Sequence, residues 1–156
     1  MKIVFLDIDG VLNCNATKDM FKYKGSNTLG IEQEKVQLLR QIIDKTDATI
    51  VLTSTWKDGW GVLDSLCDES GEYLNKQLAK EGLEIFCKTE DLTMNRGEGI
   101  NKFLKDFSMV TSYVILDDYL FEDFKMFDLT NNLVLINECI GLQQEDVFKA
   151  ISILNM

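Results

Sequence analysis

Residues 2–13 read KIVFLDIDGVLN, and the order of side chains in this stretch predicts both a fold and a site. The first five, KIVFL, form an apolar run with β-branched residues, which is typical of a strand buried on both faces. Asp7 and Asp9 follow two residues apart, so their side chains point the same way while the chain stays extended. Gly10 then permits a sharp turn and close approach of a ligand to the backbone. The stretch predicts a buried strand that delivers two carboxylates to its carboxyl end.

Strand-like and helix-like segments alternate along the chain. Apolar runs predict four further strands, at 48–54, 83–87, 113–116 and 133–136. Helical spacing of apolar residues predicts three helices, at 31–44, 97–106 and 143–154. This alternation is typical of an α/β fold, a Rossmann-like three-layer sandwich with helices on both faces of a mainly parallel sheet. Residues 13–30 are expected to form a loop or small hairpin and residues 57–82 one or two helices, so we expect a single domain over 1–156.

The chain is acidic. Its 156 residues include 16 Lys and Arg against 26 Asp and Glu, a formal net charge of −10. This balance argues against long-range attraction to nucleic acid, although it is compatible with a local basic groove. Nowhere do 18 apolar residues run together, and the first ten residues place acids where a signal peptide needs small residues. We expect a soluble, cytoplasmic protein with no membrane association and no evident obligate protein partner.

The sequence contains no histidine, and this excludes several classes of chemistry. Ser-His-Asp and Cys-His catalysis and His-ligated zinc or iron sites all need that side chain. Four cysteines, at positions 14, 67, 87 and 139, match no paired zinc-ligand spacing and are expected to be reduced, mostly buried thiols. Acid–base chemistry must therefore use carboxylates, lysine, tyrosine or a metal-bound water.

Three of the predicted strands end in polar or acidic side chains. In chain order these are Asp7 and Asp9, then Thr53, Ser54 and Thr55, then Asp117 and Asp118. In an open α/β sheet, ligands bind beyond the carboxyl ends of the strands, near the point where strand order reverses. Four carboxylates gathered there would repel one another, and a divalent cation relieves that repulsion. Hard oxygen ligands without His or Cys favour Mg²⁺.

The sequence DIDGVLN at 7–13 resembles the first motif of the haloacid dehalogenase (HAD) superfamily of phosphohydrolases and phosphotransferases. The resemblance implies that Asp7 attacks phosphorus to form an aspartyl-phosphate, and that Asp9 acts as general acid and then as general base. It also implies Mg²⁺ held by the Asp7 carboxylate and the Asp9 backbone carbonyl. A carboxylate is a competent nucleophile, and a nearby acid is suited to protonate a leaving alkoxide. A calcium loop starting at Asp7 would instead need Glu where the chain has Lys18.

The second and fourth motifs of the superfamily follow in the same order. The second, a hydroxyl that closes the next strand and binds a phosphate oxygen, matches Ser54 or Thr53. The fourth, one or two acids after an apolar strand, matches Asp118 as a metal ligand and Asp117 as a ligand or as a support for one. The segment 141–154 resembles the closing turn and helix of a small subgroup that includes domains associated with RNA-repair proteins. The resemblance spans about the whole chain.

The third motif is a Lys or Arg near a helix start, where it offsets charge on the phosphoryl group. Arg96 is the first candidate, Lys102 the second and Lys57 the third. Lys57 is also a candidate substrate-binding residue, together with three others near the motifs: Gly10, Thr55 and Trp56. The tryptophan would either stack a base or an aromatic leaving group or, as the simpler interpretation, pack against the neighbouring helix.

The resemblance implies a Mg²⁺-dependent phosphatase that hydrolyses a phosphomonoester through an aspartyl-phosphate. The insertions at 13–30 and 57–82 are short, so the chain resembles family members without a large cap domain, which act on exposed phosphates. This favours a macromolecular or otherwise accessible phosphate, whereas the acidic charge opposes approach to a nucleic acid polyanion. A nucleotide, a nucleic acid end and a phosphoprotein therefore all stay open as substrates. Two alternatives stay open: a phosphotransferase of the same family, and a non-catalytic metal-binding interaction module.

Overall fold

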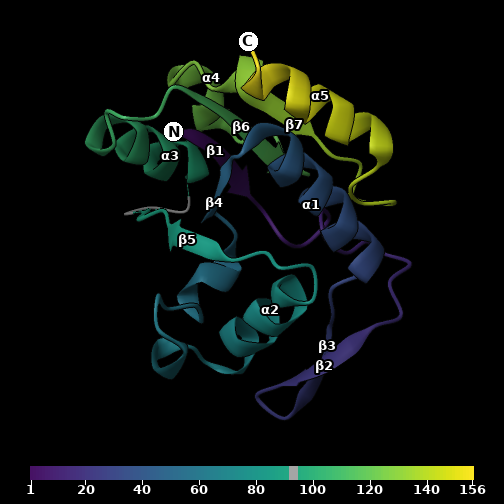
Figure 1. Cartoon of the computed structure of the whole chain (residues 1–156). Helices are drawn as coiled ribbons and strands as arrows, with labels where there is room; N and C mark the ends of the chain where they lie inside the picture. Colours follow the sequence, from purple (N-terminus) through teal and green to yellow (C-terminus); the bar gives the residue numbers. More distant parts are fainter. Residues whose placement is uncertain (92–94) are drawn as a thin grey trace.

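Five parallel strands form the central sheet, in the order β5-β4-β1-β6-β7 (Figure 1). The computed structural model describes residues 1–91 and 95–156. The sheet strands are β1 Lys2–Leu6, β4 Thr49–Leu52, β5 Ile85–Lys88, β6 Ser112–Asp117 and β7 Leu133–Leu135. A separate antiparallel hairpin consists of β2 Met20–Tyr23 and β3 Ser26–Leu29. The five predicted sheet strands are thus all present, and the segment 13–30 contains the small hairpin.

Helices cover both faces of this sheet. Their bounds are α1 Gln33–Thr46, α2 Glu69–Ala79, α3 Arg96–Asp106, α4 Glu122–Met126 and α5 Gln144–Leu154. Short 3-10 turns span Thr55–Asp58, Asp64–Leu66 and Thr130–Asn132. Helices α1 and α5 lie on one face and α3 and α4 on the other, while α2 packs against β2 (Figure 1). The expected three-layer α/β sandwich is confirmed, and the described residues of the two insertions form only the hairpin, α2 and short turns.

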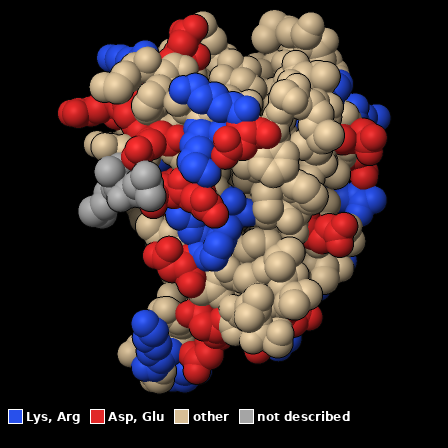
Figure 2. All heavy atoms as spheres, turned by 90° about the vertical axis from the view of Figure 1, so that its left-hand side faces the viewer, with Lys and Arg blue, Asp and Glu red and all other residues tan. Residues whose placement is uncertain are grey.

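The outer surface over the left-hand side of Figure 1, where α3 lies, carries both signs of charge. Figure 2 shows Lys and Arg side chains interleaved with Asp and Glu side chains on this face. Several of them form exposed ion pairs, which contribute little to stability. Among the described residues, no helix combines the length and apolar composition needed to cross a bilayer. The four cysteines are free thiols, as expected, but the expectation that most are buried is wrong, since only Cys14 is buried and Cys139 is exposed.

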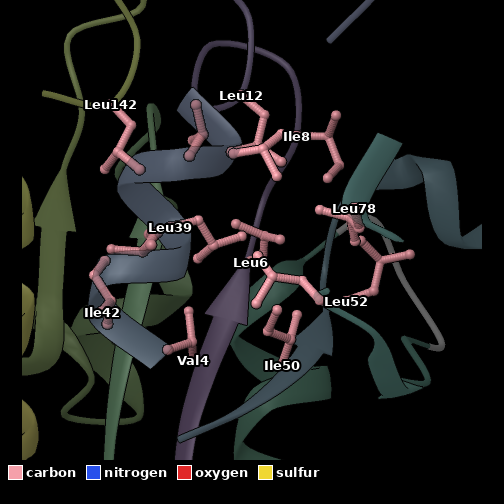
Figure 3. Packing of buried hydrophobic residues seen from close by; sticks show 14 of the residues in the cluster. Val4, Leu6, Ile8, Leu12, Leu39, Ile42, Ile50, Leu52, Leu78 and Leu142 are labelled. Carbon is pink, nitrogen blue, oxygen red and sulfur yellow. The ribbon is translucent and has the colours of Figure 1, made fainter. Parts of the chain in front are cut away.

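Alternation along β1 divides the core between the two faces of the sheet. Val4 and Leu6 point toward α1, where they pack with Leu52 and Leu39 (Figure 3). Phe5 points to the opposite face, in the cluster that includes residues of α3 and α4. Burying a side chain of this size stabilises the fold by about 1.5–3 kcal/mol. Because β1 is buried on both faces, the position of its carboxyl end is fixed.

The loop that follows β1 is anchored to the same core. Ile8, Val11 and Leu12 are fully buried. The Leu12 N–H donates to the Ile8 carbonyl at 2.8 Å, and the Leu142 N–H donates to the Val11 carbonyl at 2.9 Å. From β1 the chain builds β4 and β5 on one side and then returns to β6 on the other. The loop therefore lies at the switch point of the sheet, where ligands bind in folds of this class.

Candidate active site

Three carboxylates meet at the carboxyl ends of β1 and β6. Oxygen atoms of Asp7, Asp117 and Asp118 all lie within 4.8 Å of one another. The two strands are neighbours with Leu6 opposite Leu116, and the Asp7 N–H continues the pairing by donating to the Leu116 carbonyl at 3.0 Å. Acids that follow either strand are consequently brought side by side. Asp7 is only 4% exposed and Asp117 is fully buried, whereas Asp118 is half-buried.

Arg96, the first residue of α3, is the basic group that the structure places among these carboxylates. Its Nη1 lies 2.9 Å from Asp7 Oδ1 and also contacts the Asp117 carboxylate. The guanidinium lies over the Phe121 ring, 4.8 Å from its centroid. Asp123 secures the start of the helix, because its carboxylate accepts the Glu98 N–H at 2.9 Å. The helix start thus holds one positive charge against two buried acids.

The two other basic candidates have different partners. Lys102 forms ion pairs with Glu90 at 3.3 Å and with Asp106 at 3.0 Å, on the exposed side of α3. Lys57 pairs with Asp91 and donates to the Thr53 carbonyl at 3.4 Å. Lys57 therefore lies beside the carboxyl end of β4, where the hydroxyls are, and Lys102 is one of the exposed charged side chains on the surface of α3. Geometry favours Arg96 for the third-motif role.

Burial raises the pKa of Asp7 to about 7; Arg96 opposes this rise, and Asp117 and Asp118 add to it. Burial is also the main reason that the pKa of Asp117 and that of Asp118 are raised. One guanidinium leaves part of the negative charge of three carboxylates without compensation. A divalent cation bound by these oxygens would favour their ionised forms. The donor set, three carboxylates with no nitrogen or sulfur ligand, fits Mg²⁺.

Of the two candidate hydroxyls, the structure brings Ser54 to Asp7. The Ser54 side chain hydrogen-bonds the Asp7 carboxylate, which lowers the pKa of Asp7 in opposition to burial. The Thr53 hydroxyl oxygen is buried and has no hydrogen-bond partner among the described residues. Successive side chains of an extended chain point to opposite sides, so only one of the two can face Asp7. Thr55 is exposed at the start of the following turn.

Gly10 allows the first loop to approach the carboxylates. Its φ of 78° is unfavourable for residues with a side chain, and a Cβ there would lie 2.6 Å from the Asp118 carboxyl carbon. Gly10 and Asp118 line a cleft of about 340 Å³ together with Asp9, Asn13 and Glu138. Glu138, from the segment after β7, helps to raise the pKa of Asp118. Sequence reasoning missed Glu138, because no motif marks its position.

The Asp9 carboxylate lies outside the three-carboxylate cluster and has partners of its own. Its Oδ1 accepts the Asn13 Nδ2–H at 2.9 Å, and its Oδ2 accepts the Trp56 Nε1–H at 2.9 Å. Trp56 is only 9% exposed, so the packing interpretation describes it better than an open stacking surface. Asn13 was also missed, although it closes the DIDGVLN stretch. Its position four residues after Asp9, within the same stretch, is the signal that could have indicated it.

Comparison with known proteins identifies a family. The sequence model of a family described as "HAD domain in Swiss Army Knife RNA repair proteins" matches residues 3–147. No curated protein and no solved structure matches significantly. The matched range includes all three carboxylates of the cluster, from Asp7 in the first loop to Asp118 after β6.

Proposed function

Because this chain belongs to the family of HAD domains found in Swiss Army Knife RNA repair proteins, we propose that it is a Mg²⁺-dependent phosphatase acting through an aspartyl-phosphate. The family supports a phosphohydrolase function in general terms. The observation that carries the finer proposal is the environment of Asp7. This buried carboxylate contacts Arg96 and Ser54 and shares a cation-sized cluster with Asp117 and Asp118.

In the first half of the proposed reaction, an Asp7 carboxylate oxygen attacks phosphorus, and the bond from phosphorus to the leaving oxygen breaks. Asp9, in its protonated form, gives its proton to that leaving oxygen. Arg96 and the Ser54 hydroxyl offset negative charge on the phosphoryl oxygens. Asp7, Asp117 and Asp118 are the residues that would hold Mg²⁺. When bound, Mg²⁺ supplies further compensation of phosphoryl charge.

In the second half, Asp9 is a carboxylate and accepts a proton from water. The resulting hydroxide attacks phosphorus of the aspartyl-phosphate, the acyl oxygen of Asp7 leaves, and inorganic phosphate is released. Asp9 ends this step protonated, ready for the next substrate. The exposed position of Asp9 on the cleft is consistent with exchange of substrate, water and product.

Accessible phosphates are the substrates that we propose. Hairpin β2–β3 and α2 are the only sizeable elements of the described insertions, and neither is long enough to enclose a small metabolite. Nucleotides, phosphorylated nucleic acid ends and phosphoproteins all fit this description. Since the family is described through RNA repair proteins, phosphorylated RNA ends are the first class to test.

The test is phosphate release from RNA oligonucleotides with a 3′- or 5′-phosphate, nucleotides and phosphopeptides, with Mg²⁺ or with a chelator. We expect release that requires both Mg²⁺ and Asp7, shown by loss of activity in Asp7→Asn. Formation of a new phosphate ester that requires an added alcohol would identify a phosphotransferase instead. Stabilisation by Mg²⁺ without turnover on any substrate, and without trapping by beryllium fluoride, would indicate a metal-binding module.

A further inference from the structure

Two side chains from separate parts of the chain hold the Asp9 carboxylate, one at each oxygen. Asn13 donates to Oδ1 and Trp56 donates to Oδ2, both at 2.9 Å. Asp9 is itself exposed, so packing does not fix its side-chain torsions. We call Asn13 and Trp56 the Asp9 clamp. The two hydrogen bonds orient the carboxylate within the cleft that it shares with Asp118.

Asn13 has no freedom to turn away from Asp9. It is 1% exposed, and its Oδ1 accepts the Gly10 N–H at 2.9 Å. Its Nδ2 donates to the Gly30 carbonyl at 3.0 Å as well as to Asp9. Flipping the amide would set an oxygen against the Gly30 carbonyl and the Asp9 carboxylate, and would leave the Gly10 N–H unpaired. The amide is therefore locked with its NH₂ group toward Asp9.

Trp56 is held just as firmly, by aromatic residues of the two insertions. Its ring lies 5.4 Å from Phe21 of β2 and 6.4 Å from Tyr73 of α2, measured between centroids. Phe21 and Tyr73 stack on each other at 4.1 Å with an interplanar angle of 5°. The Tyr73 hydroxyl accepts the Ile31 N–H at 3.1 Å, which ties this cluster to the segment before α1. The direction of the indole N–H thus depends on the hairpin and on α2.

We propose that Asn13 and Trp56 are positioning residues for the general acid and base Asp9, and that the Phe21–Tyr73 stack braces the clamp. This inference rests on the proposed function. A carboxylate oxygen that accepts one hydrogen bond keeps a second lone pair for the proton it exchanges. The clamp therefore fixes where that lone pair points without occupying it, and serves both proton transfers. General acid–base catalysis contributes about 10²–10⁴-fold, and we expect loss of one donor to remove about 10- to 100-fold of it.

The chain offers a matched pair of variants, Trp56→Phe and Trp60→Phe. Trp60 is also buried, and its indole N–H donates to Asn75 at 2.9 Å. Both substitutions remove an indole hydrogen bond from a buried site, but only the first removes one from Asp9. Burst kinetics with 2,4-dinitrophenyl phosphate and turnover of glycerol 2-phosphate distinguish their effects.

Dinitrophenolate leaves without an acid, whereas breakdown of the aspartyl-phosphate needs the base. With 2,4-dinitrophenyl phosphate, we expect Trp56→Phe to give a rapid burst of dinitrophenolate and then a steady-state rate about 10- to 100-fold slower than that of the wild type. With glycerol 2-phosphate, we expect its turnover rate to fall by at least as much. For Trp60→Phe we expect wild-type kinetics. Equal behaviour of the two variants, or a slowed burst in Trp56→Phe, would overturn the positioning role.

A second readout does not depend on turnover. The two indole N–H groups give two ¹H–¹⁵N resonances, which the tryptophan variants assign. We expect Asp9→Ala to move the Trp56 resonance and leave that of Trp60 in place; an unmoved Trp56 resonance would overturn the clamp.

Absence of turnover in the wild type across the substrate panel would overturn the proposed function, and the catalytic role of the clamp with it. Turnover in the wild type with equal effects of the two variants would overturn the clamp alone.

Discussion

Replacing Asp7 by Asn is expected to stabilise the metal-free protein near pH 8 while it abolishes the proposed activity. Burial raises the pKa of Asp7 from 3.8 to about 7, even though Arg96 opposes the rise. The folded protein therefore resists ionisation of this group, whereas the unfolded chain ionises it near the ordinary value. Asn resembles the neutral form of Asp and carries no such cost.

The sign follows from proton binding in the two states. Below about pH 4, Asp7 is protonated in both, and it makes no pH-dependent contribution. Between about pH 4 and 7 the unfolded chain releases the proton and the folded protein keeps it, so the free energy of unfolding falls as pH rises. Above pH 7 the loss is complete. The difference of about 3 between the two pKa values corresponds to roughly 4 kcal/mol.

Urea unfolding followed by circular dichroism, with a chelator present, measures this difference at pH 4 and at pH 8. Asp7→Asn should gain stability over wild type of the order of 4 kcal/mol at pH 8, and the gain should shrink toward zero at pH 4. Asp106→Asn is the control, because Asp106 is an exposed carboxylate whose pair with Lys102 contributes little. The reasoning is refuted if Asp7→Asn is no more stable than wild type at pH 8, or differs from it equally at both pH values.

Three further predictions concern neighbouring residues. Gly10→Ala should lower the free energy of unfolding in urea by about 1–2 kcal/mol, because the positive φ penalises a side chain, and it should weaken Mg²⁺ binding, because the Cβ displaces Asp118. Unchanged stability in urea together with unchanged Mg²⁺ affinity by calorimetry would contradict this. Arg96→Gln should lower kcat about 100-fold, while Lys102→Gln should change it less than about twofold. Equal losses in the two variants would contradict the role of Arg96 in offsetting phosphoryl charge. Mg²⁺ should raise the Tm of the wild type, and more at pH 8 than at pH 5, because the carboxylates with raised pKa must ionise to bind it. The Tm of Asp118→Asn should rise less than that of the wild type. Calorimetric scans in which Mg²⁺ shifts the Tm of both proteins equally would count against the cation site.

The fold and the acidic cluster were accessible from sequence because both depend on local pattern. Apolar runs of strand length mark β1 and β6, and each runs directly into its acids. Parallel strands place their carboxyl ends at the same edge, so Asp7 and Asp117 had to lie near each other once the two strands became neighbours. That inference needs no knowledge of side-chain contacts.

The choice between similar candidates was not accessible in this way. The segment 48–54 reads as one strand, whereas β4 ends at Leu52, and the exact end decides whether Ser54 or Thr53 faces Asp7. Arg96 and Lys102 belong to one helix, and its rotation against the sheet decides which of them reaches the carboxylates. Both choices depend on tertiary packing, which periodicity does not report.

The proposed nucleophile and the proposed general acid depend on different parts of this fold. Asp7 is fixed by the sheet and by the start of α3, which supplies Arg96. Asp9 is held through Trp56 by the hairpin and α2, the two insertions that are too small to form a cap. Under the proposed mechanism, changes confined to the insertions should therefore affect proton transfer while the attack by Asp7 is preserved. These short insertions then serve the chemistry itself, a role distinct from enclosing a substrate.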